Sequence, residues 1–195
     1  MTKKAIGFTV VLISLLMAVP LSAKGPAAGK NGRSAGTLTP EEIHHIRYMR
    51  EEEKLARDVY LTLYEVYQAP IFGNISESEQ RHMDALERLI EKYELEDPVT
   101  NDTVGAFTNP VFADFYLAVL SLVEKGALGY CDALQVGIDI EVLDIGDIEN
   151  ALDDPNVVAR DVNRVSNNLL NGSYNHLNAF TSQSVAEECP IKEVP

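Results

Sequence analysis

Apolar residues recur every three or four positions through most of the chain between residues 38 and 182, which is the spacing of one face of an α-helix. No segment keeps the alternation of a β-strand, and no internal repeat has the length of a solenoid unit. The pattern predicts four long helices and one short helix, over about 40–67, 76–93, 110–126, 130–152 and 155–180. We therefore predict an all-α fold.

Local signals at the helix ends support this division. Thr39-Pro40-Glu41-Glu42 is a capping sequence with proline at the first helical position. Ser76 and Glu79 have the spacing of a capping box, which predicts that the second helix begins at Ser76. The stretch 97–109 is rich in Pro, Asn, Asp and Gly and is typical of a loop. The pattern therefore predicts a helical bundle with one long crossover, and the short helix lies in that crossover.

The first 23 residues have the plan of a secretory signal peptide. Two lysines precede an apolar run over 6–19, and small residues lead to Ala23. An uncleaved membrane anchor is the alternative, but the run is shorter than the roughly 20 apolar residues that a spanning helix needs. We therefore expect cleavage near Ala23 and export to a periplasmic or extracellular compartment. Residues 24–37 are expected to form a flexible linker, 38–182 the helical domain, and 183–195 a loose tail.

Acidic residues dominate the chain, with 30 Asp and Glu against 16 Lys and Arg and a formal charge of −14. Such a surface repels nucleic acid and anionic lipid, and it suits a soluble protein or one that attracts cations. No segment after the signal peptide is apolar enough to span a membrane. Cys131 and Cys189 could form a disulfide in an oxidising compartment or remain thiols, and the sequence leaves both possibilities open.

Three consecutive glutamates interrupt the apolar stripe of the first helix. Glu52 shares a face with Met49 and Val59, whereas Glu53 lies beside that stripe and Glu51 points elsewhere. Periodicity therefore leaves both Glu52 and Glu53 as inward candidates and does not choose between them.

Each other long helix also carries acidic or histidine side chains on its apolar side. These residues are Glu79 and His82 in the second, Glu141 and Asp144 in the helix over 130–152, and His176 in the last. A lone core histidine is usually structural, and a single buried carboxylate costs several kcal/mol. Four carboxylates and two imidazoles that converge need cations, and two ions of Fe, Mn or Zn would suit them. The alternative is that the assignment of residues to helix faces is wrong by one residue and that these acids face water. This alternative is strongest for Asp144 and Asp147.

Two local motifs resemble a known superfamily. Glu79-Gln-Arg-His82 has the E-x-x-H pattern of ferritin-like di-iron proteins, and Glu53-Lys-Leu-Ala-Arg-Asp-Val-Tyr60 resembles the first helix of rubrerythrin-type members. This resemblance favours Glu53 over Glu52. Across 38–182 the chain also resembles an uncharacterised branch of that superfamily, domain of unknown function 2202, through the stretches GIDIEVLDIGDIENAL and NLLNGSYNHLNAF.

The resemblance implies a ferritin-like antiparallel four-helix bundle that binds two metals. Matched position by position to the superfamily motifs, Glu53 and Glu79 would be carboxylate ligands of the metals. His82, Glu141 and His176 match its remaining ligand positions. One position departs from the pattern, because the superfamily has a glutamate about one turn before the last histidine and this chain has Gly172 and Ser173 there. Asp144 is the residue that can replace it. No C-x-x-C pair is present, so the rubredoxin-like iron site of full rubrerythrins is absent.

These features lead to an expected function. We expect an exported metal-binding protein, with iron in both positions and Mn or Zn as alternatives, that oxidises Fe(II) or reduces oxygen or peroxide. Its partners would be metal ions and a small oxidant. Tyr60 and Tyr48 are expected to support the site by hydrogen bonding, although each could simply pack in the core. The competing hypothesis is a non-catalytic helical binding protein with a structural polar core; an iron-storage cage is less favoured.

Overall fold

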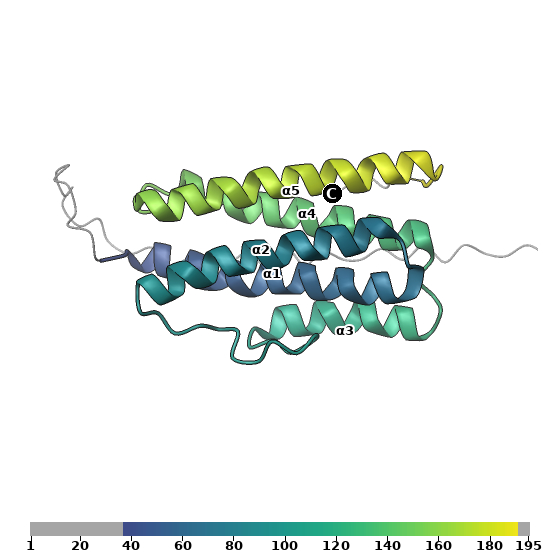
Figure 1. The fold of residues 1–195 in the computed structure, drawn as a ribbon, viewed down its shortest axis with the longest axis horizontal. Coiled ribbons are helices and arrows are strands. Elements are labelled where there is room, and N and C mark those ends of the chain that lie inside the picture. The colour runs from purple at the N-terminus through teal and green to yellow at the C-terminus, as the bar shows by residue number, and fades with distance from the viewer. Residues whose placement is uncertain (1–36, 191–195) are drawn as a thin grey trace, which may run out of the picture. The chain divides into compact units, whose positions relative to one another are not determined.

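The computed structural model describes residues 37–190, and this part of the chain contains five α-helices and no strand (Figure 1). They are α1 Pro40–Tyr67, α2 Pro70–Lys92, α3 Pro110–Glu124, α4 Tyr130–Asp153 and α5 Arg160–Ala186. The predicted all-α class is confirmed. No helix among these residues is long and apolar enough to cross a membrane. The expected signal peptide, nearly all of the expected linker and the last five residues of the tail lie outside the described residues.

The first helix begins as predicted, with a complete capping box. The Thr39 hydroxyl accepts a hydrogen bond from the Glu42 amide at 3.0 Å, and Glu42 Oε2 accepts one from the Thr39 amide at 2.7 Å. Glu42 Oε1 also accepts from the amides of Val158 and Ala159, each at 2.7 Å. The same carboxylate therefore fixes the start of α1 and the segment that leads into α5.

The second helix starts earlier than predicted. It begins at Pro70, so Ser76 lies inside the helix and its hydroxyl donates to the Gly73 carbonyl at 2.8 Å instead of capping a terminus. The capping-box interpretation of Ser76 and Glu79 is therefore wrong. Burial explains the earlier start, because Phe72 and Ile75 in this first part of α2 belong to the apolar core.

The last helix differs from prediction at both ends. It begins at Arg160, because Asp154 accepts hydrogen bonds from the Asn156 amide at 2.8 Å and from the Val157 amide at 3.0 Å, which form a turn over residues 154–157. It then continues past Phe180 to Ala186, where we had expected the end of the domain and a loose tail. Cys131 and Cys189 form a disulfide, which joins the start of α4 to the residues after α5.

Two separate apolar clusters fill the interior. One contains Leu55, Leu63, Phe72, Ile140 and Phe180 among its members. The other contains residues such as Ile46, Leu86, Leu89, Ile148 and Leu169. Each of the four long helices contributes to both clusters, and the residues between the two contributions are mainly polar.

The order of these contributions gives the direction of each helix. From their N-terminal ends, α2 and α4 pass from the first cluster to the second, whereas α1 and α5 pass in the opposite sense. The α1–α2 and α4–α5 pairs pack extensively, and α3 lies along α1 (Figure 1). Because α2 and α4 run in the same direction, the chain between them must return along the molecule, and residues 93–129, including α3, make this crossover.

The crossover covers the side of α1 that a simple amphipathic pattern would leave in water. Asp58, which is fully buried, accepts hydrogen bonds from Lys54, from Arg57 and from the Gly105 amide. Lys54 also donates to the Thr103 carbonyl at 2.9 Å. These charges of α1 therefore hold the loop before α3 in place.

Candidate metal centre

A layer of ionisable side chains lies between the two apolar clusters. All six residues that the sequence singled out as metal ligands are buried or nearly so: Glu53 on α1, Glu79 and His82 on α2, Glu141 and Asp144 on α4, and His176 on α5. The most exposed side chain of the set, that of His82, is 13% exposed. Each helix places its residues here because the neighbouring turns are anchored in apolar clusters on both sides.

Glu79 is the common element of this layer. Its Oε2 lies 2.8 Å from His82 Nδ1, and its Oε1 lies 2.9 Å from His176 Nδ1. The two imidazole rings are stacked, with centroids 5.5 Å apart. One carboxylate thus faces two imidazole nitrogens, one with each oxygen.

Each imidazole nitrogen also faces a second carboxylate. His82 Nδ1 lies 3.2 Å from Glu53 Oε2, and His176 Nδ1 lies 3.5 Å from Glu141 Oε2. Glu79, His82 and His176 each offer a donor atom within 4.8 Å of the other two, and Glu53 and Glu141 each add a carboxylate beside one of the imidazoles. The structure thus brings together five of the predicted ligands by direct contact.

Asp144, the sixth predicted ligand, is held by the residue that departs from the superfamily pattern. Its Oδ2 accepts a hydrogen bond from the Ser173 hydroxyl, and the charges of Glu79, His82 and His176 all act on its carboxyl group. Asp144 is 5% exposed, so it does not face water as the alternative helix phase would require. Ser173 of α5 therefore orients an aspartate from the neighbouring helix.

Gly172 contributes space to the site, a role that the sequence reasoning did not assign. A Cβ atom at this position would lie only 2.5 Å from His82 Cε1 and Nε2, so a larger side chain would displace the ring. The signal was present in the sequence, because Gly172 lies one turn before His176 on α5. Its meaning depended on a partner from α2 that only the packed structure supplies.

The two tyrosines occupy different positions. Tyr60 is fully buried, and its hydroxyl donates to Glu141 Oε1 at 2.7 Å, as expected for a residue that supports a ligand. Tyr48 is only partly buried, and burial together with the charges of Glu52 and Asp147, two acids outside the predicted set, raises the pKa of its hydroxyl. No hydrogen bond among the described residues joins Tyr48 to one of the six ligands.

Burial and mutual charge shift the protonation of these groups strongly. Burial raises the pKa of Glu53 well above its usual value, that of Glu141 to about 8 and that of Asp144 to about 7. Burial opposes protonation of the histidines, but contacts with Glu53 and Glu79 raise the pKa of His82 to about 11. Contacts with Glu141 and Glu79 likewise raise the pKa of His176 to about 9.

Glu79 is the exception among the carboxylates. Burial favours its neutral form, yet close contacts with the charged rings of His176 and His82 lower its pKa to about 2. In the metal-free protein, protons on the imidazoles and on the other carboxyl groups therefore balance the negative charge of the layer. A divalent cation would take the place of these protons.

Several donor atoms of the layer have no hydrogen-bond partner although they are buried. They are Glu53 Oε1, Asp144 Oδ1, His176 Nδ1 and both carboxylate oxygens of Glu52. The 2.9 Å contact of His176 Nδ1 with Glu79 lacks the alignment of a hydrogen bond. Buried polar atoms are rarely left unmatched, so these atoms fit residues that bind an ion.

The glutamates at positions 51–53 have three different environments. Glu53 faces His82, while Glu51 points to the crossover and accepts hydrogen bonds from the Thr108 and Asn109 amides. Glu52 is 2% exposed and borders Asp144 and Asp147, so it too belongs to the polar layer. Periodicity had found both inward candidates, and the structure gives each a distinct set of neighbours.

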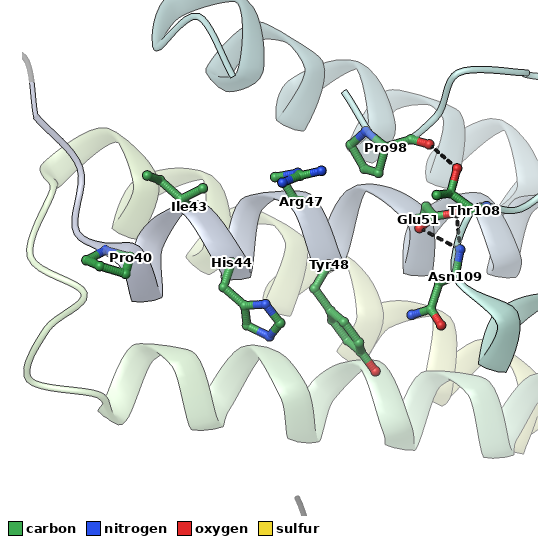
Figure 2. Close-up of a pocket in the computed structure, with 9 residues that line it drawn as sticks. All are labelled: Pro40, Ile43, His44, Arg47, Tyr48, Glu51, Pro98, Thr108 and Asn109. Atoms are coloured by element: carbon green, nitrogen blue, oxygen red, sulfur yellow. Dashed lines mark hydrogen bonds between the residues drawn. The ribbon is translucent and has the colours of Figure 1, made fainter. Parts of the chain in front are cut away.

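A pocket of about 510 Å³ lies beside the N-terminal half of α1 (Figure 2). It is lined by side chains of α1 and of the crossover, among them His44, Tyr48 and Glu51, with Thr108 and Asn109. None of the six predicted ligands lines it. Figure 2 shows the Tyr48 ring reaching from α1 toward the neighbouring helix.

Comparisons with known proteins agree on one family. The family model described as "Uncharacterized protein domain (DUF2202)" matches residues 42–189. The chain is 50% identical over 143 residues to the uncharacterized protein MJ0754 of Methanocaldococcus jannaschii, which covers 73% of this chain and 75% of the relative. The crystal structure of hypothetical protein MJ0754 from Methanococcus jannaschii superposes with a TM-score of 0.74 at 44% identity, covering 85% of this chain and 90% of that one. The chain therefore belongs to the DUF2202 family.

Proposed function

We propose that this protein is a ferritin-like protein that binds two divalent metal ions, preferably iron, between its four long helices. The observation that carries the proposal is the position of Glu79 between two imidazoles, each of which also faces a carboxylate of its own. This arrangement offers two donor sets, one around each imidazole, that share Glu79. The resemblance of the E-x-x-H motif to di-iron proteins supports the same interpretation.

The residues fit such a pair of ions in number and charge. Four carboxylates can offset the charge of two divalent cations, and the unmatched oxygens of Glu53 and Asp144 supply free donor positions. Mixed nitrogen and oxygen donors suit Fe, Mn or Zn. Asp144, oriented by Ser173, would complete the set of carboxylates that hold the ions.

The proposed activity is oxidation of Fe(II) or reduction of oxygen or peroxide. Two adjacent redox-active ions would supply electrons one from each metal, which matches the two-electron reduction of an O–O bond. The chain itself would orient the ions through Glu79, exclude water through the two apolar clusters, and hold Glu141 in place through the Tyr60 hydroxyl. Export after cleavage near Ala23 is part of the proposal and would bring the centre into an oxidising compartment.

Metal analysis of protein purified without chelator tests the centre. We expect two ions per chain in the wild type and loss of at least one in Glu79→Gln, because both donor sets share this residue. Glu77→Gln is the matched control, since Glu77 is an exposed acid on the same helix. Stoichiometry near zero in the wild type, or equal metal content in the two variants, would refute the centre.

Optical measurement of Fe(II) oxidation separates catalysis from passive binding. Metal-free wild-type protein should oxidise added Fe(II) in the presence of oxygen or peroxide faster than buffer does, and Glu79→Gln should lose this acceleration. Binding of two ions without faster oxidation would favour the alternative, a non-catalytic helical metal-binding protein. The serine at position 173 is the observation that keeps this alternative open, since it removes one carboxylate from the superfamily set.

A further inference from the structure

Three Asn-x-Ser/Thr sequences occur in the chain, and the proposed metal centre uses none of their asparagines. They are Asn74-Ile75-Ser76, Asn101-Asp102-Thr103 and Asn171-Gly172-Ser173. In exported proteins such a sequence is the acceptor for a glycan, which is attached to the asparagine side chain. The three acceptor sequences are equivalent as sequence, because each has an asparagine, a middle residue other than proline, and a hydroxyl two positions after the asparagine.

Two of the acceptor sequences lie inside helices and have a buried hydroxyl. Ser76 of α2 is 3% exposed, and its hydroxyl donates to the Gly73 carbonyl at 2.8 Å. Ser173 of α5 is 1% exposed, and its hydroxyl donates to Asp144 and to the Leu169 carbonyl. An enzyme that reads the acceptor sequence must contact both the asparagine amide and the hydroxyl. Neither helical sequence offers both groups in the folded protein.

The third acceptor sequence lies in the crossover loop before α3 and is open to solvent. Asn101, Asp102 and Thr103 are all exposed. Asn101 Oδ1 accepts a hydrogen bond from the Thr103 amide at 3.0 Å, which forms an Asx turn and brings the first and third residues together. Neither Asn101 Nδ2 nor the Thr103 hydroxyl forms a hydrogen bond with another of residues 37–190. Both groups that define the acceptor sequence are therefore available.

Contacts with α1 hold the loop in this conformation. Asp102 Oδ1 lies 2.7 Å from Arg57 Nη2, and the Thr103 carbonyl accepts a hydrogen bond from Lys54 at 2.9 Å. These contacts use the middle side chain and a backbone oxygen, so they leave the Asn101 amide nitrogen and the Thr103 hydroxyl unengaged. The pairing with Arg57 also offsets the charge of Asp102, which would otherwise repel the phosphate of a glycan donor.

We propose that Asn101 is the site of an N-linked glycan and that the fold withholds Asn74 and Asn171 from the same modification. The donor is a saccharide joined through phosphate to a lipid, and a membrane transferase catalyses the step. A bond forms between Asn101 Nδ2 and C1 of the sugar, and the bond between C1 and the phosphate oxygen breaks. One amide proton passes to a base of the transferase, and the lipid phosphate leaves. The inference rests on the export that is part of the proposed function.

A glycan at this position would protect the crossover. The crossover segment 93–109 is the longest stretch between helices in the described part of the chain, and exposed loops are the usual sites of proteolysis. Val104, directly after the acceptor sequence, is 44% exposed and would be covered. None of the six proposed metal ligands lies in the crossover, so the glycan would leave metal binding unchanged.

Transfer of a glycan to the purified protein tests the assignment. Folded, unmodified wild type is incubated with an oligosaccharyltransferase that requires only the three-residue acceptor sequence, together with its lipid-linked oligosaccharide. Mass spectrometry should find one glycan per chain, on the peptide that contains Asn101. Asn101→Gln and Thr103→Ala should each reduce transfer at least tenfold, with folding checked by circular dichroism. Asn74→Gln and Asn171→Gln are the matched controls and should leave transfer unchanged.

Short synthetic peptides separate the effect of the fold from that of the local sequence. Peptides of residues 70–80, 97–107 and 167–177 should all accept the glycan, because none of them holds its hydroxyl in a packed helix. Transfer to Asn74 or Asn171 in the folded protein at the rate of Asn101 would overturn the selection by the fold. Acceptance of the peptides without any transfer to the folded protein would overturn the site.

Protein isolated from its native host distinguishes failure of this site from failure of the proposed function. The mature chain should carry a glycan on Asn101, and Asn101→Gln should bind as many metal ions as wild type. A chain cleaved near Ala23 without the glycan would overturn the site alone. A chain that keeps its first 23 residues and lacks the glycan would overturn both the site and the proposed export.

Discussion

Single residues decide the geometry of the candidate centre more than its list of ligands does. Gly172 and Ser173 are not proposed ligands, yet each has a defined contact in the structure. The missing Cβ of Gly172 leaves room for the His82 ring, and the Ser173 hydroxyl holds Asp144. A change at either position would alter the site without removing any proposed ligand.

Gly172→Ala should weaken metal binding with little effect on folding. The new methyl group would meet the far end of the His82 side chain, which can rotate away but then leaves Glu53 and Glu79. We expect at least a tenfold loss of Zn²⁺ affinity by competition with a chelator dye, and a change in unfolding free energy below about 1 kcal/mol.

Gly146→Ala is the control for this substitution. A Cβ atom at Gly146 meets nothing within 4 Å, so alanine should leave metal affinity unchanged. Unchanged affinity in Gly172→Ala as well would contradict the assigned role of the glycine.

Tyr60→Phe tests the support of Glu141. Loss of the hydroxyl leaves Glu141 Oε1 without its 2.7 Å donor in a buried position. The unfolding free energy should fall by about 1 to 3 kcal/mol, measured by urea denaturation of the metal-free protein. Tyr174→Phe is the comparison, because its hydroxyl donates to Glu149 at an exposed site, and it should change stability by less than about 0.5 kcal/mol.

Helix α1 owes its unusual composition to its central place among the elements. Residues 49–60 are all buried, although seven of the twelve are charged. Glu53 faces α2, Glu52 faces α4, and Asp58 binds the loop before α3. The helix therefore has no solvent-facing side along this stretch, and each of its charges has a partner element.

Asp58→Ala should strongly destabilise the crossover. The substitution removes the partner of two buried cations, Lys54 and Arg57, and the acceptor of the Gly105 amide. We expect a loss of about 3 to 5 kcal/mol in urea denaturation. Asp114→Ala, at an exposed position on α3, should stay within about 0.5 kcal/mol of wild type. Equal stability of the two variants would show that the network does not hold the loop.

At the scale of the whole molecule, the polar layer couples stability to pH. His82 and His176 have pKa values raised to about 11 and 9, so protonating them stabilises the metal-free fold. This stabilisation is complete below pH 6.5 and is lost as pH rises through 9 to 11. Glu141 and Asp144 have pKa values raised to about 8 and 7, so their contribution to stability also falls as pH rises, over pH 4 to 8. Glu79 has a pKa lowered to about 2, so its ionised form stabilises the fold above pH 4.5, and this stabilisation is lost as pH falls through 2.

The metal-free protein should therefore lose thermal stability between pH 7 and 10. Metal affinity should rise over the same interval, because binding displaces protons from the imidazoles and carboxyl groups. Calorimetric melting of metal-free and Zn²⁺-loaded protein at pH 6.5 and 9 measures both effects. The melting temperature should fall with pH in the metal-free sample and fall less in the loaded one; a rise in the metal-free sample would contradict the assigned protonation.

The disulfide constrains the chain at the same scale. Cys131 and Cys189 are 58 residues apart, so the bond closes a long loop in the unfolded chain. Closing such a loop raises the free energy of the unfolded state by about 4 kcal/mol. Replacing both cysteines by serine should lower the unfolding free energy by about 2 to 4 kcal/mol and speed hydrogen exchange at the end of α5. Metal stoichiometry should not change, because neither cysteine contacts the polar layer. No change in stability would indicate that the two cysteines are not bonded.

Much of the fold could be predicted because its signals are local. The 3.6-residue period located all five helices, and Thr39-Pro40 and Pro110 marked two starts that the structure keeps. The start of α2 has the same local signal, proline at the first helical position, which the capping-box interpretation of Ser76 overlooked. The end of α5 could not be predicted, because the disulfide at Cys189 ties the residues after this helix to α4. Contacts between distant residues are not encoded in a short window of sequence.

The sequence by itself determined which face of each helix carries the acids and histidines of the polar layer, since helical periodicity assigns each residue to a face. It could not choose between Glu52 and Glu53, place Asp144, or give Gly172 a role. Only the tertiary structure decided these points, because they depend on which atoms of α2, α4 and α5 lie opposite each other. Periodicity specifies a direction from one helix axis, whereas a binding site depends on the distances between several helices.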